Sequence, residues 1–298
     1  MDEQPLDLLL AWVMRQAGDA AEWYSSAMDA MTTERDLHIV LGLAPRRLGK
    51  EDLKLDADDL AAADAAYRGW DPSGWSVDGA ARVAALLAFQ GQRPFAEIFK
   101  DLRRTSDVAE MIALYRGLPL YPNPGALHFE CGEGLRSNLK PVFEAIAHNN
   151  PFPRDHFDEH RWNHMILKAL FVGSELAPIT GLDARANPEL ARILRDYAHE
   201  RWAAERPVSP ELWRCVGPFA DDPKSLADLA RAWDEGGESR KAAALAFDAS
   251  PAQAAHDKIA GTPEAADIAA GRLSWNILAA QREDVETTPA LPNQEAIR

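Results

Sequence analysis

The chain has 298 residues, of which 47% are hydrophobic, enough to bury one sizeable core or two modest ones. Its 47 acidic and 32 basic residues give a formal net charge of −15. A surface this acidic repels phosphate backbones and anionic lipids, so the composition argues against a nucleic-acid partner and against electrostatic docking to a membrane.

Two features favour a cytoplasmic location. Asp2 and Glu3 stand where a secretory signal needs positive charge, and Arg15 closes an apolar run over 8–14 that is too short to cross a bilayer. The two cysteines, Cys131 and Cys215, lie far apart in sequence and fit buried thiols in a reducing compartment. We expect no direct membrane insertion.

Helix signals dominate the first part of the chain. Apolar residues at helical spacing predict helices over 6–17, 33–44 and 56–66, with a tight corner over 45–49. Trp70 and Trp75 belong to a compact loop and are expected to pack inwards. Ser76 is predicted to cap the next helix, and a helix pair follows over 94–104 and 107–117.

Proline and asparagine set the boundaries farther along. Two prolines within 148–153 favour an extended link, after which a helix is predicted over 155–172. Asn187 and the proline after it predict the start of a helix that runs to about Arg206. From residue 221 onward the predicted helices are shorter and rich in alanine, over 223–234, 238–249, 251–259 and 263–271.

These elements predict an all-α fold of stacked antiparallel helical hairpins, an irregular HEAT-like array with almost no strand. We expect a main helical domain over 1–220 and a C-terminal short-helix extension over 221–282 that packs on it. Residues 283–298, with two prolines and several acids, are predicted to form a disordered tail.

Several ordered blocks resemble the EboA family. They include Asn-Asn-Pro-Phe-Pro at 149–153, Trp-Asn-His-Met-Ile-Leu-Lys-Ala-Leu-Phe at 162–171 and Gly-Leu-Asp-Ala-Arg-Ala-Asn-Pro-Glu-Leu at 181–190. Further matching blocks lie at 43–49, 69–72 and 114–119, so the resemblance spans nearly the whole chain except the tail. It implies a place in an ebo-type gene cluster, beside a UbiA-type prenyltransferase.

The resemblance and the lack of a catalytic signature together predict a non-catalytic helical binding or scaffold protein. The resemblance implies a pathway that makes or exports a prenylated secondary-metabolite precursor. The expected partners are a small, largely apolar metabolite and other ebo-cluster proteins such as the UbiA-type prenyltransferase. No cofactor is expected.

Aromatic walls with few polar groups suit an apolar ligand, and they point to a central groove. Its predicted lining is Trp162, Asn163, Lys168, Tyr197, His199 and Trp213. A related hypothesis joins polar residues of three segments in one shared site, namely Asn150, Asp158, Asn163, Lys168 and Arg185. The structural alternative is that Asn163 holds the Asn150 loop and Lys168 pairs with Asp158 or Glu175.

The alternative function is an enzyme acting on an isoprenoid- or cyclitol-like intermediate. His199 with Asp196 or Glu200 forms a minimal acid/base pair, although such pairs are also common on helix surfaces. Metal assistance would use His160 and His164, one helical turn apart. The simpler interpretation of these two histidines is a solvated helix face, and no metal is expected.

Overall fold

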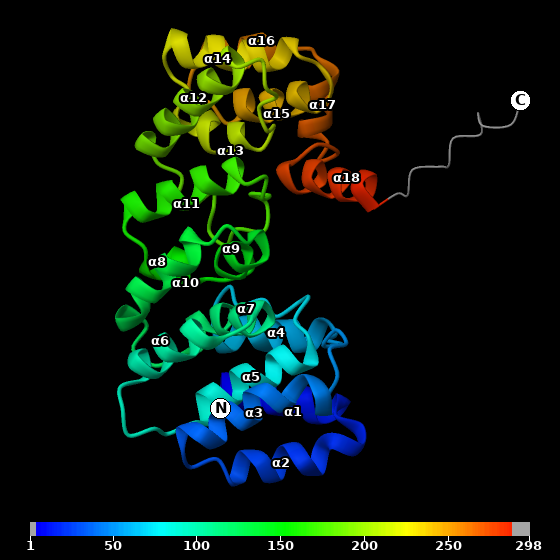
Figure 1. Cartoon of the computed structure of the whole chain (residues 1–298). Helices are drawn as coiled ribbons and strands as arrows, with labels where there is room; N and C mark the ends of the chain where they lie inside the picture. Colours follow the sequence, from blue (N-terminus) through cyan, green and yellow to red (C-terminus); the bar gives the residue numbers. More distant parts are fainter. Residues whose placement is uncertain (1–3, 288–298) are drawn as a thin grey trace, which may run out of the picture. The chain divides into compact units, whose positions relative to one another are not determined.

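The computed structural model describes the backbone of residues 4–287 and the side chains of residues 4–281. Over this range the chain forms eighteen α-helices and four short 3₁₀ turns, with two isolated β-bridges and no strand (Figure 1). The all-α prediction is confirmed. None of the helices within 4–287 is both long enough and apolar enough to cross a bilayer. Residues 288–298, most of the predicted tail, lie outside the described residues.

The chain divides into two compact units, Met1–Met165 with Pro178–Gly181, and Ile166–Ala177 with Leu182–Arg298. The first unit holds α1 (Pro5–Gln16), α2 (Ala21–Asp29), α3 (Glu34–Arg47), α4 (Ala57–Ala66), α5 (Val77–Ala88), α6 (Phe95–Thr105), α7 (Val108–Arg116), α8 (His128–Arg136), α9 (Lys140–Ala147) and α10 (Phe152–His156).

The division falls within α11 (Glu159–Phe171). The second unit then holds α12 (Pro188–Ala203), α13 (Leu212–Val216), α14 (Pro223–Asp234), α15 (Gly237–Asp248), α16 (Gln253–Ile259), α17 (Pro263–Ala269) and α18 (Trp275–Thr287). The HEAT-like stacking and the predicted boundary at residue 220 stay predictions.

Helix α5 is the central helix of the first unit. It packs against α1, α3 and α7, which surround it in Figure 1, and nine of its twelve residues are buried. Ser76 caps it as predicted, because its Oγ accepts a hydrogen bond from Gly79 N at 3.2 Å. The alanines of α5 leave room for close neighbours, so this helix has no solvated face.

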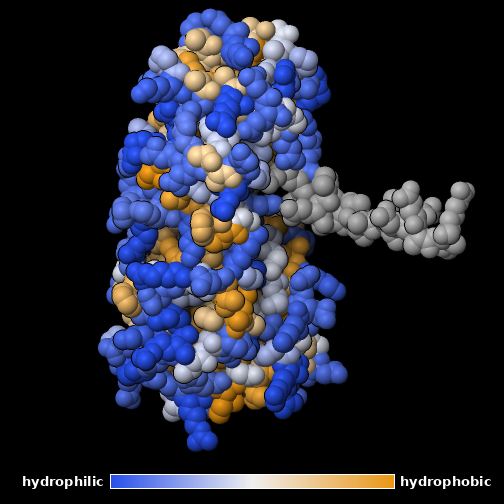
Figure 2. Space-filling view, turned by 45° about the horizontal axis from the view of Figure 1, so that its top comes forward, coloured by the Kyte–Doolittle hydropathy of each residue, from blue (hydrophilic) through white to orange (hydrophobic). Residues whose placement is uncertain are grey.

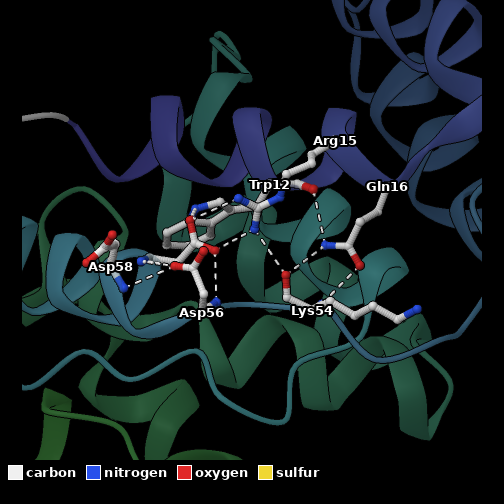
Figure 3. Close-up of polar contacts among 7 residues, drawn as sticks. Trp12, Arg15, Gln16, Lys54, Asp56 and Asp58 are labelled. Atoms are coloured by element: carbon white, nitrogen blue, oxygen red, sulfur yellow. Dashed lines mark hydrogen bonds and ion pairs between the residues drawn. The ribbon is translucent and has the colours of Figure 1, made fainter.

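A polar network joins the end of α1 to the segment that enters α4 (Figure 3). Trp12 Nε1 donates to Asp59 Oδ1 at 2.8 Å, and Arg15 donates to Asp59 Oδ2 at 2.5 Å. Lys54 N donates to Gln16 Oε1 at 2.9 Å. The hydrogen bond from Arg15 lowers the pKa of the Asp59 carboxyl. The network therefore fixes how α1 lies against α4 at one edge of the first unit.

The two loop tryptophans pack inwards, as predicted. Trp70 and Trp75 are buried, with ring centroids 6.1 Å apart, and Trp70 also contacts Trp12 at 5.6 Å. Both cysteines, Cys131 and Cys215, are free and buried.

The visible surface is mainly hydrophilic, with hydrophobic residues in separate groups (Figure 2). The larger exposed apolar side chains are Met14, Ile39, Val108, Phe129, Leu139 and Phe171.

The predicted corner at 45–49 is wrong at its start, because α3 continues through Pro45 to Arg47. A proline has no N–H, so Pro45 leaves the carbonyl of Leu41, four residues earlier, without its helical donor. Arg82 Nε of α5 donates to this carbonyl at 3.0 Å. The helix therefore tolerates the proline because another helix supplies the missing hydrogen bond.

The extended link predicted over 148–153 contains the start of a short helix, α10, and α11 begins at Glu159 instead of residue 155. Asn150 Oδ1 accepts from Phe152 N at 3.0 Å and stabilises the first turn of α10. Asp158 Oδ1 accepts from Arg161 N at 2.7 Å, so a second helix start lies at Asp158. Two side-chain acceptors thus divide what the sequence suggested was one helix.

Arg154 of α10 lies against two glycines. A Cβ added to Gly181 would lie 2.7 Å from Arg154 Cγ, and one added to Gly69 would lie 2.6 Å from Arg154 Nη1. Both glycines have positive φ, +81° and +85°. Arg154 Nη2 donates to the Arg68 carbonyl at 2.7 Å, so the side chain is held in place between them.

We predict that Gly181→Ala destabilises the chain more than Gly49→Ala does. Gly49 has a similar φ of +83°, but no atom lies within 4 Å of an added Cβ. Gly49→Ala should cost only the backbone strain, about 1–2 kcal/mol. Gly181→Ala adds crowding against Arg154, about 1–3 kcal/mol more. Urea unfolding followed by circular dichroism measures both, and equal losses would contradict the close packing of Arg154.

Candidate functional site

The residues predicted to line a central groove belong to both units. Trp162 and Asn163 lie in the first unit, and Lys168, Tyr197, His199 and Trp213 lie in the second. Trp162, Asn163 and Trp213 are 0–1% exposed, while Tyr197 and Lys168 are half-buried and His199 is exposed. The groove as a whole stays a prediction.

Asn150 and Asp158 brace the corners on either side of α10. The Asn150 amide is buried and donates to the carbonyls of Tyr115 and Ala145, both at 3.0 Å. Its oxygen accepts from Phe152 N, and the Asp158 carboxylate caps α11. These contacts stabilise the backbone, the buried Asn150 from within the core and Asp158 from an exposed position.

Lys168 and Arg185 are both half-buried in the second unit. Burial lowers the pKa of Lys168. The carbonyl of Arg185 accepts from Asn187 Nδ2 at 3.1 Å, and Asn187 caps α12 as predicted. The shared site predicted for these residues with Asn150, Asp158 and Asn163 includes residues of both units and stays a prediction.

His199 pairs with a carboxylate that the sequence analysis did not identify. Its Nε2 lies 2.9 Å from Asp228 Oδ1 of α14, and Arg195 Nε donates to Asp228 Oδ2 at 2.7 Å. Asp196 instead accepts from Arg192 Nη1 at 2.6 Å, and Glu200 is exposed. The enzymatic alternative would therefore use Asp228 as the carboxylate that orients His199.

His160 and His164 are exposed neighbours on α11, with ring centroids 4.3 Å apart. Among the described residues, no three His, Cys, Asp or Glu side chains lie together as a metal site would require.

Tyr197 lines a cavity of about 250 Å³ in the second unit, with Leu170, Arg201 and the loop 207–210. Arg201 Nε donates to the Pro207 carbonyl at 3.0 Å, which holds this loop against α12. Tyr197 is thus one predicted residue that the structure places at a cavity.

The first unit contains a second cavity, of about 270 Å³, which we call the apolar cavity. Its walls come from α3, α5, α6 with the residue after it, and α7, and five of the lining side chains are aliphatic while five are polar. The lining is His38, Leu41, Arg82, Leu86, Leu102, Thr105, Ser106, Glu110, Ala113 and Leu114.

A neighbouring cavity of about 230 Å³, which we call the basic cavity, lies between the start of α5 and α7. It is lined by Lys50, Trp75, Ser76, Asp78, Gly79, Arg82, Ala109, Ile112, Ala113 and Arg116. Arg82 and Ala113 line both cavities, so the two are adjacent and the Arg82 side chain lies where they meet.

Arg82 and Asp78 form a buried ion pair one helical turn apart, and they are 4% and 3% exposed. Arg82 Nη1 donates to Asp78 Oδ2 at 3.0 Å, and Ser76 Oγ donates to Asp78 Oδ1 at 2.6 Å. Arg82 Nη2 lies 3.8 Å from Glu110 Oε1. Each oxygen of the Asp78 carboxylate therefore has a donor, as a buried charge requires.

Sequence reasoning missed this site because an Asp and an Arg four residues apart usually form a solvated surface pair. The composition of the helix around the two residues could have revealed the buried pair. The rest of the helix from Val77 to Ala88 is alanine, valine, leucine and glycine, which leaves no polar face for the pair to occupy. A charged pair in such a helix has to be buried among neighbours.

Three comparisons with known proteins place this geometry in context. A family model described as "Metabolite traffic protein EboA" matches residues 6–217. Comparisons with curated proteins and with solved structures gave no match. The matched residues include the linings of both cavities in the first unit.

We predict that Arg82→Met destabilises the chain by about 3–5 kcal/mol, because it leaves the Asp78 carboxylate buried without its cation. The double variant Asp78→Asn with Arg82→Met should recover part of this loss, since no uncompensated charge is then buried. Urea unfolding measures both variants. A double variant as unstable as Arg82→Met would show that the ion pair is not what the single change disrupts.

Proposed function

Because the chain belongs to the EboA family of metabolite traffic proteins, we propose that its first unit binds a small, largely apolar metabolite in the apolar cavity. The protein holds this metabolite without changing it chemically. The observation that carries the proposal is the cavity itself, in which five aliphatic side chains, four of them leucines, lie beside five polar ones. Sites for small organic ligands likewise combine apolar walls with polar groups that fix the orientation of the ligand.

The size of the apolar cavity limits the ligand. A cavity of 150 Å³ accepts benzene, so about 270 Å³ accommodates roughly ten non-hydrogen atoms by proportion. A chain of ten carbons fits this volume. Leu41, Leu86 and Leu114 would contact such a chain, while Arg82, which also lines the neighbouring cavity, would contact a polar end.

We further propose that this ligand is a prenylated secondary-metabolite precursor of an ebo-type pathway that makes or exports it. The aliphatic walls support a branched hydrocarbon chain as part of the ligand. In this proposal the protein presents the ligand to other members of the pathway, such as a UbiA-type prenyltransferase. The negative charge of the whole chain favours partner surfaces that are basic.

The proposal predicts that the full chain binds geraniol, an uncharged ten-carbon isoprenoid alcohol, and that Thr105→Trp weakens this binding at least about tenfold. Thr105 is exposed and lines the apolar cavity, so a large side chain there can occupy it with little repacking of the core. Isothermal titration calorimetry measures the affinity. Each tenfold change in Kd corresponds to about 1.4 kcal/mol of binding free energy.

The matched control is Arg104→Trp, an exposed neighbour on α6 that does not line the cavity. It should bind geraniol as the unaltered chain does. Equal affinity in all three proteins, or no binding at millimolar geraniol, would contradict the proposal. Mass spectrometry of small molecules released from the purified chain then identifies the natural ligand.

A further inference from the structure

We propose that the basic cavity binds the phosphate monoester head of the ligand whose apolar chain occupies the apolar cavity. This inference rests on the function proposed above and names the class of ligand, an amphiphilic molecule with an apolar chain and a doubly charged anionic end.

The charges that line the basic cavity are the first support. Lys50, Arg82 and Arg116 are cations, and Asp78 is the one carboxylate in the lining. The Asp78 carboxylate already accepts from Arg82 and Ser76. Lys50 and Arg116 therefore leave two positive charges at the cavity, on a chain whose formal net charge is −15.

Arg116 is the second support, because it is half-buried at the C-terminus of α7 without a carboxylate. Its Nη1 donates to the Gly74 carbonyl at 3.1 Å, and no Asp or Glu within the described residues forms an ion pair with it. Burial lowers the pKa of Arg116, since no anion offsets the lost hydration. A bound anion would supply the missing counter-charge and accept from the remaining guanidinium N–H groups.

The start of α5 adds to the positive potential. Ser76, Asp78 and Gly79 at this end of the helix line the basic cavity, where the helix dipole favours an anion. The amides of Val77 and Gly79 are already bonded, to the Glu51 carbonyl and to Ser76 Oγ. The helix end therefore contributes through its field, and the cationic side chains provide the direct contacts.

The charge favours phosphate over carboxylate. A phosphate monoester carries about −1.5 to −2 at pH 7, which matches the two uncompensated cations, whereas a carboxylate carries half of that or little more. Arginine also binds phosphate with two parallel hydrogen bonds. Because Arg82 lines both cavities, the head of one ligand can contact it while the chain extends beside Leu86.

The test compares four probes on the full chain by isothermal titration calorimetry, namely geranyl monophosphate, geranic acid, geraniol and inorganic phosphate. Geranyl monophosphate should bind at least about tenfold tighter than geraniol, with geranic acid between them, because each charge-assisted hydrogen bond adds affinity. Inorganic phosphate, which lacks the chain, should bind more weakly than geranyl monophosphate.

Arg116→Met should reduce the affinity for geranyl monophosphate about tenfold and leave the affinity for geraniol unchanged. Arg104→Met, outside both cavities, is the matched control and should change neither. Thermal unfolding verifies that Arg116→Met is folded. If Arg116→Met does not fold, Lys50→Met provides a second test, because Lys50 is exposed. Its affinity for geranyl monophosphate should fall by about twofold to fivefold.

The outcomes separate the two proposals. If geraniol binds but the phosphate adds no affinity, the head-group site is overturned and the apolar cavity stands. If geranyl monophosphate binds through Arg116 while geraniol never binds, the proposal that one ligand occupies both cavities is overturned. If no probe binds, both proposals fail. A tenfold phosphate gain that Arg116→Met abolishes supports the inference.

Discussion

The buried guanidinium of Arg82 connects the parts of the first unit. It donates to the Leu41 carbonyl, which Pro45 leaves without a helical donor, and it pairs with Asp78 on its own helix. The first contact allows α3 to continue past a proline, and it also fixes the position of α3 against α5. The second contact compensates the charge. Without both, the centre of this unit would contain an unsatisfied carbonyl and an uncompensated carboxylate.

A buried ion pair is an uncertain source of stability, because the cost of removing two charges from water often equals their attraction. An apolar pair of similar size would fill the same space, but it would leave the Leu41 carbonyl without a donor. Besides this donor role, Arg82 serves as a polar wall of both cavities. The same side chain then secures the helix packing and provides the polar end of the proposed ligand site.

The sequence predicted several features that depend on neighbouring residues, although it missed the cap at Asp158, and it missed contacts between residues far apart in the chain. The caps at Ser76 and Asn187 were correct because a cap acts within its own first turn. The helix through Pro45 was missed because its missing donor, Arg82, is 37 positions away along the chain. Asp228, the partner of His199, was missed for the same reason, and α18 was missed entirely. No periodicity reveals a cavity, since a cavity is formed by several helices together.

In this proposal Arg82 and Arg116 contact one ligand from adjacent cavities. Nuclear magnetic resonance of the arginine Nε–Hε groups tests it directly during a titration with geranyl monophosphate. The Arg82 and Arg116 signals should shift together along one binding curve, while the signal of Arg104, outside both cavities, stays in place. Shifts confined to arginines elsewhere, with Arg82 and Arg116 unchanged at saturation, would contradict it.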